Sequence, residues 1–96
     1  MISLEDLRAK TDEICSIVQK HGAGNVRIFG SVARGDTHPD SDVDLLIDIV
    51  GPTPPWFPGG LLSDLESLLG QRVDIVIARS LNPLLRDAVL RDAVAL

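Results

Sequence analysis

Apolar residues near the N-terminus recur at helical spacing. One stripe of such a helix would contain Leu4, Leu7, Ile14, Ile17 and Val18. Most of the charged residues in this stretch lie off the stripe, which is typical of an amphipathic helix. Ser3 followed by Asp6 predicts an N-cap with an acidic third position, and Gly22 predicts the end of the helix. The pattern therefore predicts one helix that covers a sheet, with His21 as a cation near the helix dipole.

Three short apolar runs have the length and composition of strands. The first spans 26–29 and ends in a Gly-Ser pair, and the second spans 43–47 and follows an Asp-rich connection. The third spans 72–78, where Val73, Ile75 and Ile77 alternate with Arg72, Asp74 and Val76. We therefore expect three strands, each with one face toward an apolar core.

Two further helices are expected after the second strand. The first follows from a leucine stripe that ends at Gly70 and consists of Leu61, Leu62, Leu65, Leu68 and Leu69. Asn82-Pro83 predicts the start of the second, with asparagine as the cap and proline at the first helical position. This last helix is expected to run close to the C-terminus, and its inward side would consist of Leu85, Ala88, Val89 and Ala93. Leu90 and Val94 would lie partly off that side, where a partner protein or a second copy of the chain could make contact.

The segment 51–60, between the second strand and the leucine stripe, contains four prolines and three glycines. This composition is incompatible with a regular helix or a central strand. Phe57 is expected to pack onto the core. For Trp56 the sequence leaves two interpretations open: it plugs the loop, or it forms an apolar lip for an adenine ring or a partner protein.

The expected order of elements is helix, strand, short helix, strand, helix, strand, helix. This order is typical of an α/β fold with a small three-stranded mixed sheet. We expect the helices mainly on one face of the sheet and the acidic side chains on the other. Ninety-six residues suffice for one domain with a modest core and are too few for two, so residues 1–96 are expected to form a single domain.

The connection between the first two strands contains the residues that point to chemistry. Asp42 and Asp44 are two residues apart at the start of the second strand, so the period of two puts both carboxylates on one face. Paired carboxylates repel each other, proteins keep them ionised chiefly with a cation, and oxygen ligands favour magnesium. Gly30 and Ser31, at the end of the first strand, offer N–H groups and a hydroxyl as a phosphate cradle. A phosphate cradle beside a dicarboxylate metal site predicts phosphoryl or nucleotidyl transfer.

Three further polar residues have alternative roles. Asp74 is a carboxylate in the middle of an apolar strand, where a solvated role is unfavourable and metal ligation would explain its presence. Arg34 could reach nucleotide phosphates, or it could form an ion pair with Asp36 or Asp40. His38 lies in a polar turn and is expected to be a surface residue, because magnesium prefers oxygen ligands.

The composition excludes several classes of function. The net charge is −5, no cluster of Lys and Arg is present, and aromatic residues are few, so a nucleic-acid groove is not expected. The single cysteine, Cys15, excludes an internal disulfide and fits a reducing compartment. No stretch has the length and hydropathy of a membrane span, and no signal-peptide pattern follows Met1. We therefore expect a soluble, cytoplasmic protein.

The spacing of the polar residues resembles that of a known family. Gly30-Ser31, ten intervening residues and the run 42–44 are similar to the signature of the polymerase-beta-like nucleotidyltransferases. The runs 31–35 and 41–42 most resemble its minimal branch, the antitoxin half of HEPN–MNT toxin–antitoxin pairs. The run 72–76 also resembles the strand that provides the third carboxylate of the family. The resemblance extends along nearly the whole chain.

This resemblance implies a reaction and a partner. The ligands of two magnesium ions would be Asp42, Asp44 and Asp74, and the nucleotide contacts would be Gly30, Ser31 and Arg34. ATP would be the donor, AMP the transferred group, and the acceptor a tyrosine hydroxyl of a HEPN ribonuclease toxin. The expected function is that of an antitoxin that AMPylates its toxin, and the partner or a second copy of the chain would form the other wall of the site.

Two other functions stay open at this stage. A protein of this family could neutralise its toxin by binding alone, as a masking antitoxin without turnover, although all three carboxylates are present. It could instead adenylylate a small molecule such as an antibiotic or a metabolite. The lack of an added domain that would grip such an acceptor weighs against this third function.

Overall fold

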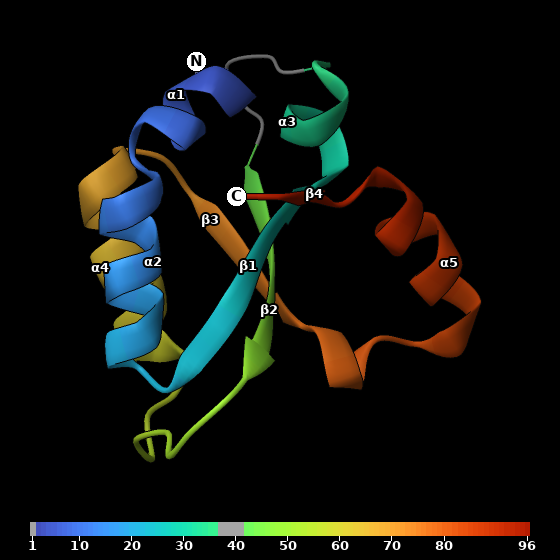
Figure 1. Ribbon diagram of the computed structural model, residues 1–96. Helices are drawn as coiled ribbons and strands as arrows, with labels where there is room; N and C mark the ends of the chain where they lie inside the picture. The colour runs from blue at the N-terminus through green and yellow to red at the C-terminus, as the bar shows by residue number, and fades with distance from the viewer. Residues whose placement is uncertain (1, 37–41) are drawn as a thin grey trace.

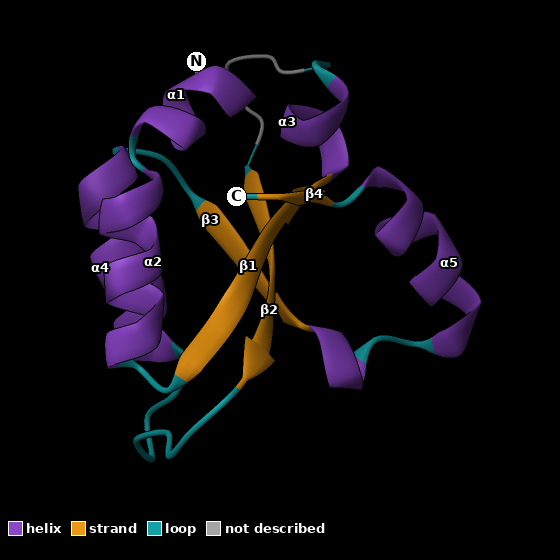
Figure 2. Ribbon diagram, viewed as in Figure 1, coloured by secondary structure: helices purple, strands orange, loops and turns teal. Residues whose placement is uncertain are grey.

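A computed structural model describes residues 2–36 and 42–96, and Figures 1 and 2 show its helices and strands. The helices are α1 (Leu4–Ala9), α2 (Thr11–Lys20), α3 (Gly30–Arg34), α4 (Gly59–Leu69) and α5 (Pro83–Asp92), with a short 3-10 turn, η1, at Ala78–Ser80. The strands are β1 (Ala23–Phe29), β2 (Val43–Ile49), β3 (Val73–Ile77) and β4 (Val94–Ala95). Within the described ranges, no helix has the length and hydropathy needed to cross a membrane. The expected α/β order is confirmed, with a divided first helix and one additional strand.

The described strands form one mixed sheet in the order β3-β2-β1-β4. β2 pairs with β3 in parallel, whereas β1 pairs antiparallel with both β2 and β4. The prediction of three strands was wrong by one, because β4 has only two residues, too few for a period of two to be read from the sequence. Ala93 ends α5 in an extended conformation, and Val94 then pairs with Ile28 at the edge of the sheet.

Helices α2 and α4 lie together on one face of the sheet (Figure 2), and the apolar core lies between them and the strands. The strand residues predicted to face inward are confirmed, since the side chains that lie in or against this core include Val43, Leu45, Ile47, Val73, Ile75 and Ile77. The buried residues of the two helices are Ile14, Val18, Leu61, Leu65 and Leu69. Each fully buried side chain of this kind stabilises the fold by about 1.5–3 kcal/mol, so this layer is the main source of stability.

The predicted first helix is two helices, because the chain leaves the helical conformation at Lys10 (φ −111°, ψ 18°). The Thr11 hydroxyl donates a hydrogen bond to the Arg8 carbonyl at 2.9 Å and so competes with the helical backbone bonds at the break. The predicted N-cap is confirmed: the Asp6 N–H donates to the Ser3 hydroxyl, and the Ser3 N–H donates to the Asp6 carboxylate.

His21 lies at the end of α2 as expected, but its ring also contacts another helix. Its Nε2 atom lies 2.8 Å from Oδ2 of Asp64 in α4, so this pair joins the two covering helices. The proline-rich loop after β2 is irregular until α4 begins at Gly59. Phe57 packs against the core, as predicted, whereas Trp56 is 67% exposed.

Helix α5 is attached less firmly than α2 and α4. Its start is confirmed, since the Asn82 side chain accepts a hydrogen bond from the Leu84 N–H at 2.9 Å. None of its residues is buried, and Leu84 and Leu85 are 89% and 58% exposed. The inward side predicted for this helix was therefore wrong: Leu85 and Ala88 are exposed, and only Val89 of that side in α5 is partly buried. In Figure 1, α5 lies on the other side of the sheet from α2 and α4.

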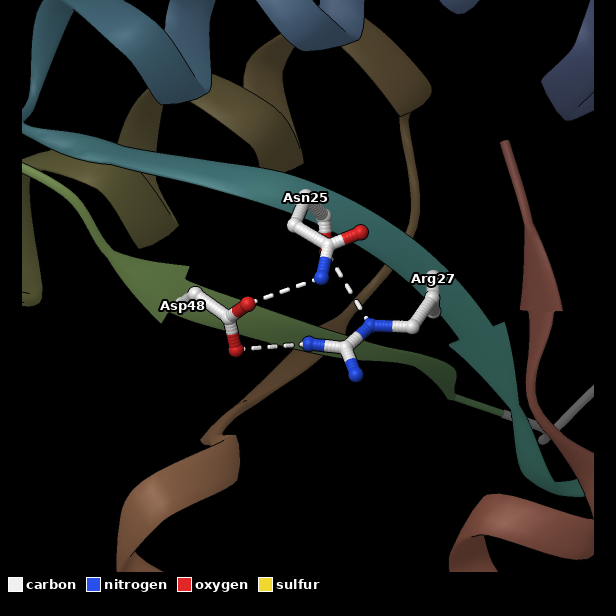
Figure 3. A network of polar contacts seen from close by, with 3 residues as sticks. All are labelled: Asn25, Arg27 and Asp48. Carbon is white, nitrogen blue, oxygen red and sulfur yellow. Dashed lines mark hydrogen bonds and ion pairs between the residues drawn. The ribbon is translucent and has the colours of Figure 1, made fainter.

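The sheet face turned away from α2 and α4, which we call the carboxylate face, contains Asp44, Leu46 and Asp48 of β2, Asp74 and Val76 of β3, and Arg27 of β1. Figure 3 shows a polar network on it: Arg27 donates to Asp48 at 2.8 Å, and Asn25 donates to the second oxygen of the same carboxylate at 2.7 Å. The network lies where the register of β1 shifts between Gly24 and Arg27, and where Asn25 has a φ of 50°. The bonds from Asn25 and then Arg27 lower the pKa of Asp48, so this carboxylate stays ionised and supports the irregular strand.

Candidate functional site

The sheet places Asp44 and Asp74 side by side. Strands β2 and β3 run in parallel, and these two residues are register partners. Asp42 lies one residue before β2 and two residues before Asp44. The charges of Asp74 and Asp42 both act on Asp44, so the three predicted carboxylates are neighbours. Pairing of the third predicted strand with the second brings them together.

The pKa of Asp44 is raised from 3.8 to about 6. Desolvation by burial is the largest cause, the negative charges of Asp74 and Asp42 add to it, and the positive charge of Arg34 acts in the opposite direction. Ionisation of Asp44 at neutral pH therefore costs free energy in the protein alone. A cation bound beside it would remove that cost.

Asp42 is partly buried at the entrance to β2. Its Oδ1 atom is inaccessible to solvent and has no hydrogen-bond partner among the residues that the structure describes. The Arg72 Nε atom lies 3.1 Å away, which is close enough for an ion pair, but it is not aligned for a hydrogen bond. Among the described ion pairs, Arg72 pairs with Asp42 and Arg27 pairs with Asp48. The third carboxylate, Asp74, is exposed.

Gly30 and Ser31 form the turn from β1 into α3. Gly30 has a φ of 73°, which L side chains rarely adopt, and a Cβ at this position would overlap the Oδ2 atom of Asp44. The Asp44 carboxylate therefore packs directly on the backbone of the turn. The N-cap of α3 is Phe29, which provides no side-chain hydrogen bond, so the N–H groups of the first turn have no side-chain cap.

Arg34, the last residue of α3, forms two ion pairs. Its Nε atom lies 3.4 Å from Asp36, as one of the alternatives predicted, and its Nη1 atom lies 2.9 Å from Asp92 of α5. Asp92 was missed by the sequence reasoning, because it is 58 residues from Arg34 and no local pattern marks it. Contacts between α3 and α5 bring the two together. Asp40, the other alternative partner, lies outside the described residues.

The described part of the chain contains no group of three acidic, histidine or cysteine side chains arranged closely enough to hold one ion as they stand. His38, expected to be a surface residue, lies outside the described residues. A hollow of about 390 Å³ opens between α1 and the end of α4, where Lys10 and Leu69 are among its lining residues. None of the six predicted site residues lines this hollow, so the candidate site, on the carboxylate face and the Gly30-Ser31 turn, lies apart from it.

Known proteins match this chain over most of its length. Residues 11–96 match the family described as nucleotidyltransferase domain. The protein adenylyltransferase MntA of Thermococcus cleftensis is 35% identical over 96 residues, which cover 98% of this chain and 96% of that protein. The candidate protein adenylyltransferase MJ0435 of Methanocaldococcus jannaschii is 37% identical over 82 residues, which cover 85% of this chain and 88% of that protein.

Solved structures share the fold. One described as a candidate minimal nucleotidyltransferase has 47% identity and a TM-score of 0.85, and the match covers 99% of this chain and 97% of that one. A chain in a crystal structure of a toxin–antitoxin with AMP-PNP has 23% identity and a TM-score of 0.74. That match covers 88% of this chain and 69% of the other, and at this identity it is evidence for the fold alone. Because the family match spans residues 11–96 and the relatives agree over most of their own lengths, the chain belongs to the nucleotidyltransferase domain family, whose minimal members it resembles.

Proposed function

We propose that the protein transfers AMP from ATP to a tyrosine hydroxyl of a HEPN-type ribonuclease toxin and acts as the antitoxin of that toxin. The main support is the group of neighbouring carboxylates, Asp42, Asp44 and Asp74, packed against a glycine turn. The relative MntA, similar along nearly the whole of both chains, is named a protein adenylyltransferase. Solved structures with this fold include toxin–antitoxin complexes.

The residues of the site fit magnesium. All three side chains offer carboxylate oxygens, the ligands that this hard cation prefers. Asp44 is desolvated beside two like charges, which favours a bound cation. The buried Oδ1 atom of Asp42 has no hydrogen-bond partner among the described residues, and its ion pair with Arg72 shows that it attracts positive charge. We therefore assign Asp42, Asp44 and Asp74 as ligands of two magnesium ions, which would lower the pKa of the acceptor hydroxyl and stabilise the departing pyrophosphate.

Each protein group then has a defined task in the transfer. The acceptor oxygen forms a bond to the α-phosphorus of ATP while the bond from that phosphorus to the pyrophosphate oxygen breaks. Asp74, the most exposed of the three carboxylates, accepts the proton of the hydroxyl. Gly30 and Ser31 orient the terminal phosphates through N–H groups and a hydroxyl, and Arg34 adds positive charge.

The carboxylate face is open to a partner at Asp74. Asp74 is exposed, and α5 on this side of the sheet has no buried residue. We propose that residues 1–96 form one catalytic unit and that the toxin provides the other wall of the site. The acceptor hydroxyl would then arrive with the partner, on the side of Asp74.

The proposed function is tested by the intact mass of the toxin after incubation with this protein, ATP and magnesium. Wild type is expected to add AMP-sized increments, and Asp42→Asn is expected to add none, because a neutral amide is a poor substitute for a charged metal ligand. Asp12→Asn is a matched control, since Asp12 is exposed on α2. A toxin that is fully inhibited by wild type without any added mass would contradict the proposal and favour a masking antitoxin.

A further inference from the structure

Helix α5 and strand β4 have few attachments to the rest of the chain. α5 buries none of its residues, and β4 pairs only two residues with β1. The Leu96 N–H donates to the Val26 carbonyl at 3.1 Å, and Asp92 of α5 forms its ion pair with Arg34 of α3. This ion pair therefore joins a weakly packed helix to the short helix that begins at Gly30.

The two carboxylates that pair with Arg34 lie at different distances from its guanidinium. Its Nη1 atom lies 2.9 Å from Asp92, the distance of a charge-assisted hydrogen bond, whereas its Nε atom lies 3.4 Å from Asp36, near the upper limit for such a bond. The pKa of Arg34 follows the same order, since the bond to Asp92 raises it more than the bond to Asp36 does. Asp92 is therefore the main partner of this guanidinium.

The guanidinium keeps donors available close to the carboxylates. Within the described part of the chain, the hydrogen bonds of Arg34 use Nε and Nη1, which leaves the two N–H groups of Nη2 for an anion. Its positive charge acts on Asp44, so Arg34 lies within electrostatic reach of the proposed metal and phosphate site. A guanidinium that is already fixed loses less side-chain entropy when it binds a phosphate.

We propose that Asp92 is a positioning residue of the nucleotide site: its carboxylate fixes the Arg34 guanidinium beside the carboxylate face, where Arg34 binds the triphosphate of ATP. The proposal rests on the function proposed above and adds α5 to the parts of the chain on which ATP binding depends. Asp92 acts through Arg34 and does not itself contact the nucleotide. A merely structural Asp92 would affect the attachment of α5 and leave the affinity for ATP unchanged.

Calorimetric titration with ATP and magnesium tests this role without any acceptor. In Asp92→Asn the dissociation constant for ATP is expected to rise about threefold to tenfold, because a neutral amide holds the guanidinium less firmly. Asp92→Glu is expected to recover most of the affinity. Asp87→Asn removes an exposed charge from the same helix and is expected to bind ATP as wild type does, because the Asp87 carboxylate forms no hydrogen bond or ion pair in the described ranges. With a toxin acceptor, the KM for ATP should rise in Asp92→Asn while kcat changes little.

The same titration in an Arg34→Ala background separates positioning from a general loosening of α5. There, Asp92→Asn is expected to change the dissociation constant less than about twofold, because its partner is absent. An equal rise in both backgrounds would overturn the proposal, as would tighter ATP binding by Asp92→Asn, which would show that Asp92 competes with the nucleotide. Failure of the proposed function gives a different result, since wild type would bind ATP in this titration and add no AMP to the toxin. A wild type that binds no ATP would overturn both.

Discussion

Along strand β2, alternate residues face two very different environments. Toward α2 and α4, the side chains of Val43, Leu45 and Ile47 have no exposed area. On the carboxylate face, Asp44 is partly buried between like charges, and its pKa is raised to about 6. Burial of apolar surface stabilises the folded state, whereas burial of a carboxylate among like charges destabilises it. Leu46 on the carboxylate face is fully buried as well, so the contrast is between Asp44 and the apolar positions of the strand. The apolar positions specify the fold, and in the function proposed above Asp44 serves binding and chemistry.

The largest effect is expected from a change on the carboxylate face that leaves the fold intact. Asp74→Asn should lower the rate of AMP transfer about 100-fold or more, since several kcal/mol of transition-state stabilisation depends on this ligand. The affinity for ATP should change less than about threefold, because the loss falls mainly on the transition state. Transfer rate, ATP affinity and melting temperature are measured on the same variant. A near-normal rate would remove Asp74 from the site.

A substitution on the face of β2 that packs against α2 and α4 should change stability and leave the transfer rate nearly unchanged. Leu45→Ala removes a fully buried side chain and should lower the free energy of unfolding by about 2–5 kcal/mol. Transfer by the molecules that remain folded should stay within about twofold of wild type. Urea denaturation gives the first quantity, and the rate corrected for the folded fraction gives the second. A rate loss far beyond the unfolded fraction would show that the two faces are not separable.

The pH dependence of stability should report the charge on Asp44. Between pH 3.8 and about 6 the folded state holds a proton that the unfolded state releases, so stability falls as the pH rises through this window. The difference between the two pKa values of Asp44 corresponds to a loss of about 3 kcal/mol in the free energy of unfolding. Solvent screening at this partly exposed group reduces the expected loss to about 1–2 kcal/mol. Magnesium at the proposed site would bind the ionised carboxylates, and its addition should therefore restore stability at pH 7.

Melting curves of wild type and Asp44→Asn at pH 4.5 and 7, with and without magnesium, isolate this contribution from that of other carboxylates. The variant is expected to lose both the fall with pH and most of the response to magnesium. A wild type whose melting temperature does not respond to magnesium at pH 7 would contradict the assignment of these carboxylates as magnesium ligands.

The smallest effect is expected in α5. Leu84→Ala makes the same chemical change as Leu45→Ala, but Leu84 is 89% exposed, so the free energy of unfolding should change by less than about 0.5 kcal/mol. Urea denaturation of the two leucine variants in parallel compares a buried position in β2 directly with an exposed position in α5. A loss of more than about 1 kcal/mol for Leu84→Ala would show that α5 packs more closely than the structure indicates.

Local patterns were sufficient to predict the two faces of the strands. Alternation in 43–47 and 72–78 predicted which side chains are buried, and parallel pairing of β2 with β3 then placed Asp44 beside Asp74. The caps at Ser3 and Asn82 were predicted for the same reason, since each depends on residues at most three positions apart.

Contacts between distant residues could not be predicted in this way. The pair formed by Arg34 and Asp92 depends on where α5 packs, and nothing near either residue specifies it. The apolar positions of α5 predicted an inward side, but a helical stripe shows only that a face is apolar and not whether another element covers it. Strand β4 was missed because two residues, Val94 and Ala95, are too few for a pattern.

The central claim is that the apolar positions of β2 stabilise the fold whereas Asp44 serves catalysis. It is tested most directly by the rate of AMP transfer by Asp44→Asn, measured together with the melting temperature of this variant at pH 7. Removal of the charge should reduce transfer about 100-fold or more, because a metal ligand is lost. The melting temperature without magnesium should equal or exceed that of wild type, because a desolvated charge among like charges is removed. Transfer close to the wild-type rate would contradict the account, and so would a loss of transfer accompanied by a clear fall in melting temperature.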